Sequence, residues 1–271
     1  MVTKSGRGHL KIMFKKSLVA AVGTLLVFAC LALCPPRTFA QTPVIVELFT
    51  SEGCSDCPSA DALITQLSNQ RNSGKTELIL LEEHVDYWNS SGWFDRFSSS
   101  DFTDRQNRYV KQFHLATAYT PQMVVDGKFQ GVGNSVSGVR SMLMEASSNL
   151  KSSTVSLRFV SPGKLAVTVD DSTHGRQKVF LAVTEDNLTT NVHGGENGGR
   201  VLTHSSVVRN LKSLGNTSDG KFETTVDLPA KSDWKKQDLR AAVIVQDPSS
   251  GLILGAASIP YQTASPTASG R

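Results

Sequence analysis

The chain has 271 residues, and its 28 basic side chains slightly outnumber its 24 acidic ones. The first 40 residues hold six of the basic side chains and no acidic one, so residues 41–271 carry 22 basic against 24 acidic side chains. The excess of basic side chains lies in the first 40 residues and gives no argument for nucleic-acid binding, so we expect no nucleic-acid partner.

Residues 1–40 have the pattern of a secretory signal peptide. Basic side chains stand at the start, an apolar run occupies residues 18–33, and a small-x-small pattern ends at Ala40. Such a segment is typically removed on export, here by cleavage after Ala40. A retained anchor and a lipoprotein attached at Cys34 are the alternatives, although the run is short for a span of roughly 20 residues. We therefore expect an exported protein with no stable membrane span after processing.

Residues 41–152 are predicted to form an α/β domain with the element order β-α-β-α-β-β-α. Apolar, β-branched runs indicate buried strands, and apolar residues at helical spacing indicate helices. Asp126-Gly127, between two short apolar runs, predicts a tight hairpin. An aromatic-rich insertion occupies residues 84–101. The predicted strands are 44–49, 77–83, 122–125 and 128–132, and the predicted helices begin near Pro58, Phe102 and Ser135.

After residue 152 the hydrophobic pattern changes to alternation, which is typical of strands with one buried face. Short alternating segments separated by turn residues predict an all-β, sandwich-like domain over residues 153–262. Residues 263–271, rich in Ser and Thr, are predicted to be a flexible tail. The predicted strands are 155–159, 165–169, 179–183, 201–208, 222–228, 241–245 and 252–259.

The sequence Cys54-Ser55-Asp56-Cys57 lies between a predicted strand and a predicted helix. A helix N-terminus stabilises a thiolate, which is the attacking species in disulfide exchange. We expect Cys54 to be the exposed nucleophile and Cys57 the buried resolving thiol. Half of a zinc site has the same spacing, but residues 41–271 contain no second cysteine pair to complete it.

Three features together resemble the thioredoxin superfamily: the strand at 44–49, the motif from Cys54 to Pro58, and Thr120-Pro121 before the third strand. The resemblance implies a thioredoxin-like fold in which the peptide bond before Pro121 is cis. It also implies that Pro121 faces Cys54 and shapes the groove. The backbone of Thr120 would then pair with an extended substrate.

The chain is also similar to an uncharacterised family of secreted bacterial thioredoxin-like proteins, a domain of unknown function. The passages that carry this resemblance fall in both predicted domains. The family has no established substrate, so the resemblance supports the fold and a periplasmic or extracellular location more than an activity. The passages are 46–54, 84–88, 120–122, 194–197 and 202–204.

Four residues are weaker candidates around the cysteines. A carboxylate at Asp56 should raise the pKa of a neighbouring thiol by like-charge repulsion, which would make the pair less oxidising. His84 is a candidate proton carrier, although a structural histidine is the simpler interpretation. Trp88 and Trp93 either line a substrate groove or pack the insertion onto the domain.

Two further groups receive structural interpretations. Arg105, Arg108 and Lys111 recur at helical spacing and predict a solvated helix face. His193-Gly194-Gly195-Glu196 and His204 contain metal-ligand types, but a glycine-rich turn followed by a strand explains them more simply. We therefore assign no metal site and no cofactor.

The leading hypothesis is an exported thiol-disulfide oxidoreductase, whose partners are protein or small-molecule thiols and disulfides. The first alternative is an extracytoplasmic copper-binding or delivery module, in which His84 or His114 joins the two thiolates. The second alternative is a non-catalytic binding protein with a structural disulfide, which exported compartments favour.

Overall fold

The computed structural model describes residues 1–2, 41–72 and 75–261. The predicted signal peptide beyond its first two residues and the predicted tail at 263–271 lie outside the described residues. The chain divides into residues 1–40 and one compact unit, Gln41–Arg271. Within the described part, none of the helices has both the length and the apolar character needed to cross a membrane.

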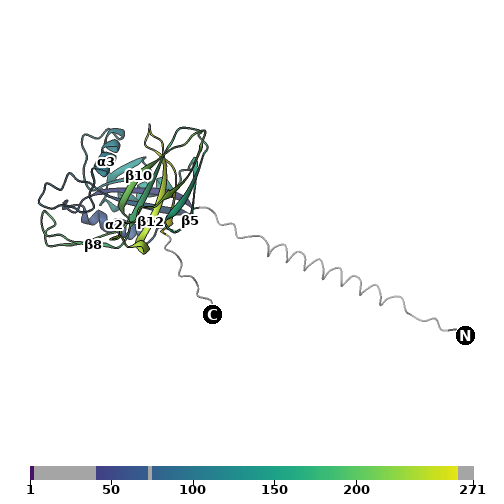
Figure 1. Ribbon diagram of the computed structural model, residues 1–271, viewed down its shortest axis with the longest axis horizontal. Coiled ribbons are helices and arrows are strands. Elements are labelled where there is room, and N and C mark those ends of the chain that lie inside the picture. Colours follow the sequence, from purple (N-terminus) through teal and green to yellow (C-terminus); the bar gives the residue numbers. More distant parts are fainter. Residues whose placement is uncertain (3–40, 73–74, 262–271) are drawn as a thin grey trace. The chain divides into compact units, whose positions relative to one another are not determined.

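The first half of the compact unit has the predicted order of elements (Figure 1). The central strand β1 pairs in parallel with β2 and antiparallel with β3, and β3 forms a hairpin with β4. Asp126 and Gly127 both have positive φ, 53° and 62°, as the predicted tight turn requires. The elements are β1 (Thr42–Thr50), α2 (Pro58–Ser68), β2 (Thr76–His84), α3 (Ser100–Gln112), β3 (Gln122–Val125), β4 (Phe129–Val132) and α4 (Val136–Ser147).

Strand β1 is buried on both of its faces. Successive side chains of a strand point to opposite faces, so each face packs against a different part of the protein. Val46 and Leu48 pack with residues of α2 and α4 in one apolar cluster. Ile45 and Phe49 belong to separate clusters on the other side, which include residues of α3. Helices therefore cover both faces of this strand, and the loop that follows β1 lies at the start of α2.

The second half is built almost entirely of strands. The predicted strand at 201–208 is instead divided between two strands, because residues 205 and 206 belong to neither. Ser206 has a positive φ of 64°, which breaks the extended conformation. A further short strand precedes these two strands, and a 3-10 turn occupies Lys236–Asp238. The strands are β5 (Ser153–Ser161), β6 (Lys164–Asp171), β7 (Lys178–Glu185), β8 (Leu188–Asn191), β9 (Val201–His204), β10 (Val207–Asn216), β11 (Lys221–Asp227), β12 (Leu239–Gln246) and β13 (Ile253–Pro260).

The two predicted domains share one eight-stranded sheet, in the order β13-β12-β7-β10-β2-β1-β3-β4. The halves join where β10 runs parallel to β2 and Val207 pairs with Glu82. Ile79 and Leu81 of β2 pack in the same apolar cluster as Val208 of β10. Residue 152 is therefore not a boundary between separate cores, because strands from both sides of it bury their side chains together.

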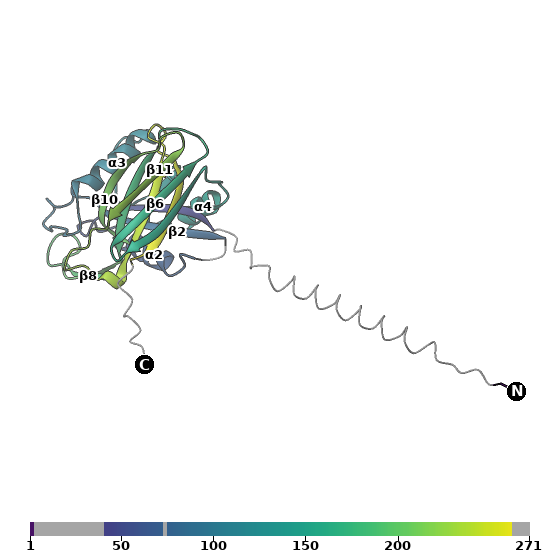
Figure 2. The same ribbon diagram turned by 45° about the vertical axis from the view of Figure 1, so that its right-hand side comes forward.

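The second half contains a local two-layer arrangement of strands. A three-stranded sheet, β11-β6-β5, covers the β7 and β12 part of the large sheet through one apolar cluster (Figure 2). Leu165 and Val167 of β6 are fully buried against Leu181 of β7 and Val243 of β12 in this cluster. This second layer buries one face of the large sheet near β7 and β12, on the other side of β10 from β1 and β2.

Arg105 of α3 is buried, so the predicted solvated face was wrong at this position. Its side chain donates through Nε and Nη2 to the two carboxylate oxygens of Glu47 at 2.8 and 2.9 Å. Glu83 of β2 lies 3.4 Å from the same guanidinium. Glu47 and Glu83 are carboxylates inside apolar strands and need a cation, which helical spacing does not reveal. Arg108 and Lys111 are exposed as expected.

Replacing Arg105 by Met is expected to lower the free energy of unfolding by about 3–5 kcal/mol, because Glu47 would remain as a buried charge without its partner. The matched control is Arg108→Met on the exposed face of the same helix, with an expected change below about 0.5 kcal/mol. Denaturant unfolding followed by circular dichroism measures both. Equal stability of the Arg105 variant and the unaltered chain would contradict the role assigned to this ion pair.

Candidate functional site

The two cysteines of the motif form a disulfide at the start of α2. Their Cα atoms are 5.4 Å apart. Cys57 is the N-cap residue of α2, and Pro58 begins the helix, as its missing N–H allows. Cys54 is 2% exposed and Cys57 is fully buried. The expectation of an exposed Cys54 is therefore wrong for this oxidised form, because residues from the second half of the chain cover it.

The cover is the glycine-rich segment between β8 and β9. Asn197, fully buried, donates from Nδ2 to the backbone oxygen of Glu52 at 2.9 Å and to that of Cys54 at 2.8 Å. The backbone N–H of Ser55 donates to Glu196 Oε2 at 3.1 Å. This segment, which we call the cover loop (residues 193–199), is thus held by two of its side chains, which bind backbone atoms in and next to the cysteine motif.

Close backbone approach explains the glycines of the cover loop. A Cβ at position 194 would lie 2.4 Å from the backbone oxygen of Gly92. Gly195 has a φ of 65°, and a Cβ there would lie 3.0 Å from Cβ of Trp93. The glycines let the cover loop lie directly against the aromatic insertion, so they serve packing and not phosphate binding.

The aromatic insertion connects the cysteine motif to the proline loop. The peptide bond between Thr120 and Pro121 is cis, as expected. Trp88 donates from Nε1 to Thr120 Oγ1 at 2.8 Å. A Cβ at Gly53 would lie 3.2 Å from Cβ of Trp88, so the residue before Cys54 has little room for a side chain. Trp88 therefore touches both loops, and the expected contact of Pro121 with Cys54 stays a prediction.

The other weak candidates occupy different environments. Trp93 donates from Nε1 to Glu52 Oε2 at 2.8 Å, so it packs against the cysteine loop. Asp56 is exposed beside Ser55. His84 is fully buried, with Nδ1 2.7 Å from Asp95 Oδ2. Its ring is engaged on both nitrogens and is not free to join the cysteine sulfurs.

A cluster of ionisable side chains lies inside the protein next to the cysteine motif. Glu82 contacts two histidines of this cluster. Its Oε1 lies 2.6 Å from His204 Nδ1 and 3.1 Å from His84 Nε2. Each member of the cluster is at most 2% exposed. We call these residues the buried histidine cluster: Glu52, Asp61, Glu82, His84, Asp95 and His204.

Burial and mutual charge strongly shift the pKa values in this cluster. Burial and the Glu82 carboxylate raise the pKa of Asp61 to about 7. Burial lowers the pKa of His204, but Glu82 and Glu52 together outweigh this effect and the pKa rises to about 10. Burial likewise disfavours the His84 cation, yet Asp95 and Glu82 together hold the pKa of His84 well above its ordinary value. The cluster can therefore hold positive charge on side chains that are enclosed by the protein.

Most of this cluster was missed from the sequence. His204 had been grouped with His193 and Glu196, but the structure separates them: His193 packs edge-on against Trp93, and Glu196 binds Ser55. The available signal was the run of charged residues at the end of β2, where an apolar strand continues into Glu82, Glu83 and His84. Buried charges of this kind require partners, and those partners come from distant positions.

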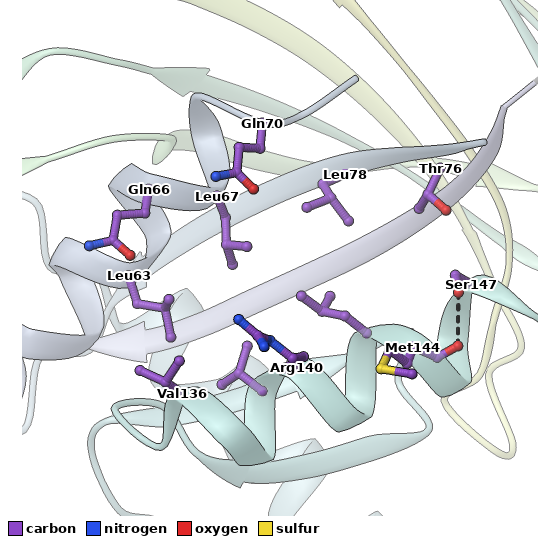
Figure 3. A pocket seen from close by; sticks show the side chains of 12 residues that line it. Leu63, Gln66, Leu67, Gln70, Thr76, Leu78, Val136, Arg140, Met144 and Ser147 are labelled. Carbon is purple, nitrogen blue, oxygen red and sulfur yellow. Dashed lines mark hydrogen bonds between the residues drawn. The ribbon is translucent and has the colours of Figure 1, made fainter. Parts of the chain in front are cut away.

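An apolar cavity lies elsewhere on the molecule, between α2, α4 and the edge of β2. Its volume is about 370 Å³. Figure 3 shows Leu63 and Leu67 of α2 on one side and Arg140 and Met144 of α4 on the other. Neither the cysteines nor the cover loop contributes to its lining, so the cavity is separate from the cysteine site.

The chain was compared with protein families, curated proteins and solved structures. Residues 45–246 match the family described as "Protein of unknown function (DUF1223)". The chain is also similar to the X-ray crystal structure of a protein from Agrobacterium tumefaciens, with 26% identity and a TM-score of 0.66 over 83% of this chain and 97% of that one. No curated protein matches the chain.

Two other solved structures align more weakly. A domain of the outer membrane lipoprotein Omp28 from Porphyromonas gingivalis covers 41% of this chain and 88% of its own, with 10% identity and a TM-score of 0.26. A DUF3823 protein from Bacteroides ovatus covers 40% of this chain and 52% of its own, with 14% identity and a TM-score of 0.25. Likenesses of this strength carry no argument about the present chain.

Asn197→Ala is expected to increase the rate at which a small thiol reductant opens the Cys54–Cys57 disulfide. The variant loses two hydrogen bonds that fasten the cover loop, each contributing about 0.5–1.5 kcal/mol. About 1.4 kcal/mol corresponds to a tenfold change in the opening equilibrium of the loop, so we expect the disulfide to be reduced roughly ten times faster. The rate of reduction is measured by alkylation of the free thiols and mass spectrometry. Asn191→Ala, at an exposed position in β8, is the matched control and should react at the original rate. An unchanged rate in Asn197→Ala would show that the cover loop does not limit access.

Proposed function

The chain belongs to the DUF1223 family of proteins of unknown function, and we propose that it is an exported thiol-disulfide oxidoreductase that works through Cys54 and Cys57. The observation that carries the proposal is the disulfide between these residues at the first turn of α2. A helix N-terminus favours the thiolate that exchange chemistry needs.

A thioredoxin-like architecture for the first half is part of this proposal. It is supported by the order of elements, by the parallel pairing of β1 with β2, and by the hairpin that adds β3 antiparallel to β1. The cis bond before Pro121 lies at the start of β3, and Trp88 reaches from the neighbouring Thr120 to the cysteine loop. These features support the resemblance, and the contact of Pro121 with Cys54 is the part of it that remains to be tested.

The exchange would proceed in two steps. In the reduced protein, the Cys54 thiolate attacks a substrate disulfide, forms a mixed disulfide with one substrate sulfur and releases the other as a thiolate. The Cys57 thiolate then attacks Cys54, re-forms the internal disulfide and releases the second substrate thiolate. The substrate gains two electrons and the cysteine pair loses two, which another thiol protein would restore. No cofactor takes part.

Access to Cys54 requires displacement of the cover loop. Asn197 and Glu196 hold this loop on the cysteine motif in the oxidised form. Trp88 and Trp93 lie beside the motif and would contact a substrate that enters once the loop moves. The protein would therefore act on substrates able to compete for the loop's hydrogen bonds, among which an extended peptide is the simplest.

Export from a bacterial cytoplasm fits this chemistry. The basic and apolar pattern of residues 1–40 is that of a secretory signal. An internal disulfide persists in an oxidising compartment such as the periplasm and is rare in the cytosol. We place the activity in the periplasm or outside the cell.

A non-catalytic binding protein is the second candidate, because burial of both cysteines favours it. Cys54 is 2% exposed and Cys57 fully buried, so the disulfide resembles a structural cross-link. Phe94, 72% exposed on the aromatic insertion, would then belong to the binding surface. This candidate predicts a bond that mild thiol reductants do not open.

The reduction potential of the pair separates the two candidates. We expect a value on the order of −270 to −120 mV in glutathione buffers, the range of proteins that exchange disulfides. The measurement is alkylation of the equilibrated protein followed by mass determination. A potential below about −300 mV would indicate a structural bond and remove the support for exchange.

Single cysteine variants test the assignment of roles. Cys57→Ser is expected to accumulate a mixed disulfide when Cys54 attacks a substrate disulfide and releases one substrate sulfur as a thiolate, because the thiol that would resolve the adduct is absent. Cys54→Ser is the matched control, and it should form no such adduct since Cys57 is buried in the first turn of α2. The adducts are measured by mass spectrometry after acid quenching. Equal trapping by both variants would contradict the assignment of Cys54 as the nucleophile.

A further inference from the structure

We propose that Glu82, His84 and His204, with Asp61 as a fourth ligand, bind one divalent first-row transition-metal ion, such as Zn²⁺, inside the protein next to the disulfide. This site uses no cysteine. It is therefore separate from the exchange chemistry and from a copper site built on the thiolates.

The donor atoms have suitable spacing for such an ion. Glu82 Oε1 lies 3.1 Å from His84 Nε2 and 2.6 Å from His204 Nδ1. Asp61 Oδ2 lies 3.9 Å from His204 Nδ1. In a tetrahedral Zn²⁺ site with bonds of about 2.0–2.1 Å, neighbouring donors stand about 3.3–3.4 Å apart. The donor atoms of Glu82, His84 and His204 lie within 4.8 Å of one another, whereas Asp61 falls outside this group and its carboxylate would have to move toward them to complete the coordination.

The groups behind the proposed ligands also fit a metal site. Histidines that bind metals usually donate their other ring N–H to a carboxylate, which fixes the ring and the tautomer. His84 Nδ1 lies 2.7 Å from Asp95 Oδ2, and Asp95 is itself held by the backbone N–H groups of Glu52 and Phe97 at 2.9 Å each. His204 Nε2 lies 3.6 Å from Glu52 Oε1, close enough for an ion pair but without a hydrogen bond. Both rings therefore present their remaining nitrogen toward Glu82.

Unpartnered buried atoms provide independent support. Asp61 Oδ2 has no hydrogen-bond partner, although the residue is only 2% exposed. Its other oxygen accepts from Thr50 Oγ1 at 2.7 Å, which fixes the carboxylate with Oδ2 on the His204 side. Buried polar atoms are rarely left without a partner, and a missing ion is one recognised reason.

The charge of the cluster points the same way. Four carboxylates, those of Glu52, Asp61, Glu82 and Asp95, lie against two imidazoles. The carboxylates outnumber the imidazoles by two, and a divalent cation would offset two carboxylate charges. Two imidazoles with carboxylates suit zinc and its neighbours, whereas soft Cu(I) prefers sulfur ligands.

The competing explanation is a metal-free network in which both histidines are cations. It accounts for the contacts to Glu82 and places Asp61 Oδ2 3.9 Å from the His204 ring, but it gives that oxygen no hydrogen bond. The two explanations differ in one measurable respect, which is whether a tightly held ion accompanies the folded chain. Because all four ligand side chains are enclosed, the ion would enter during folding, so the experiment supplies the metal to growing cells.

The test measures metal in the processed protein purified, without chelators or metal-affinity steps, from cells supplied with zinc or, separately, with cobalt. We expect about one ion per chain by elemental analysis and native mass spectrometry. The cobalt form should show the visible absorption of a four-coordinate nitrogen and oxygen site and no sulfur-to-cobalt charge-transfer band. This spectrum is recorded on the unaltered chain, so it does not depend on any variant folding.

Three variants complete the test. His204→Gln should reduce bound metal at least tenfold, whereas His174→Gln, an exposed histidine outside the cluster, should keep it. A Cys54→Ser, Cys57→Ser chain should also keep its ion, which separates this proposal from the oxidoreductase proposal. Unaltered protein with metal at background level in both cultures would overturn the inference. Metal lost on removal of the cysteines, or a sulfur-to-cobalt band, would overturn it as well.

Discussion

The carboxylate of Glu82 is the constraint on which much of the structure depends. It is fully buried at the point where the two halves of the sheet join, and its residue pairs with Val207 across that junction. Its backbone N–H donates to Ser206, and its side chain contacts His204 and His84. A buried carboxylate requires such partners. The end of β9 is therefore held against β2, and this fixes where the preceding cover loop can lie.

The position of the cover loop follows from that attachment. The loop leaves β8 and returns into β9, whose last residue is His204. With His204 held at Glu82, Asn197 reaches the backbone of Glu52 and Cys54. The disulfide in the first half is thus enclosed by the second half. The contact between Glu82 and His204 joins the two halves of the sheet and also positions the loop that encloses the sulfur atoms. The stability of the sheet junction and the reactivity of the disulfide are therefore physically linked.

The sequence was sufficient for features that depend on neighbouring residues. The order of elements through α4, the hairpin at Asp126-Gly127 and the cis bond before Pro121 were all predicted and observed. Family membership was predicted in its general form. Features that depend on distant pairing were missed: Glu82 and His204 lie 122 positions apart, and Arg105 meets Glu47 across 58 positions. Helical or strand spacing predicts which face a side chain occupies but not what it will face.

The buried charges follow the same alternation as the apolar residues around them. In β2, Leu80 packs with α2 and α4, and Glu82 and His84 continue on that face toward Asp61. Leu81 packs on the opposite face, where Glu83 meets Arg105 of α3. One strand therefore carries two separate charged centres, because adjacent residues point to opposite sides. The Arg105 centre uses a guanidinium, which stays charged at any ordinary pH, whereas the histidine centre uses two imidazoles, which are also ligands for metal ions.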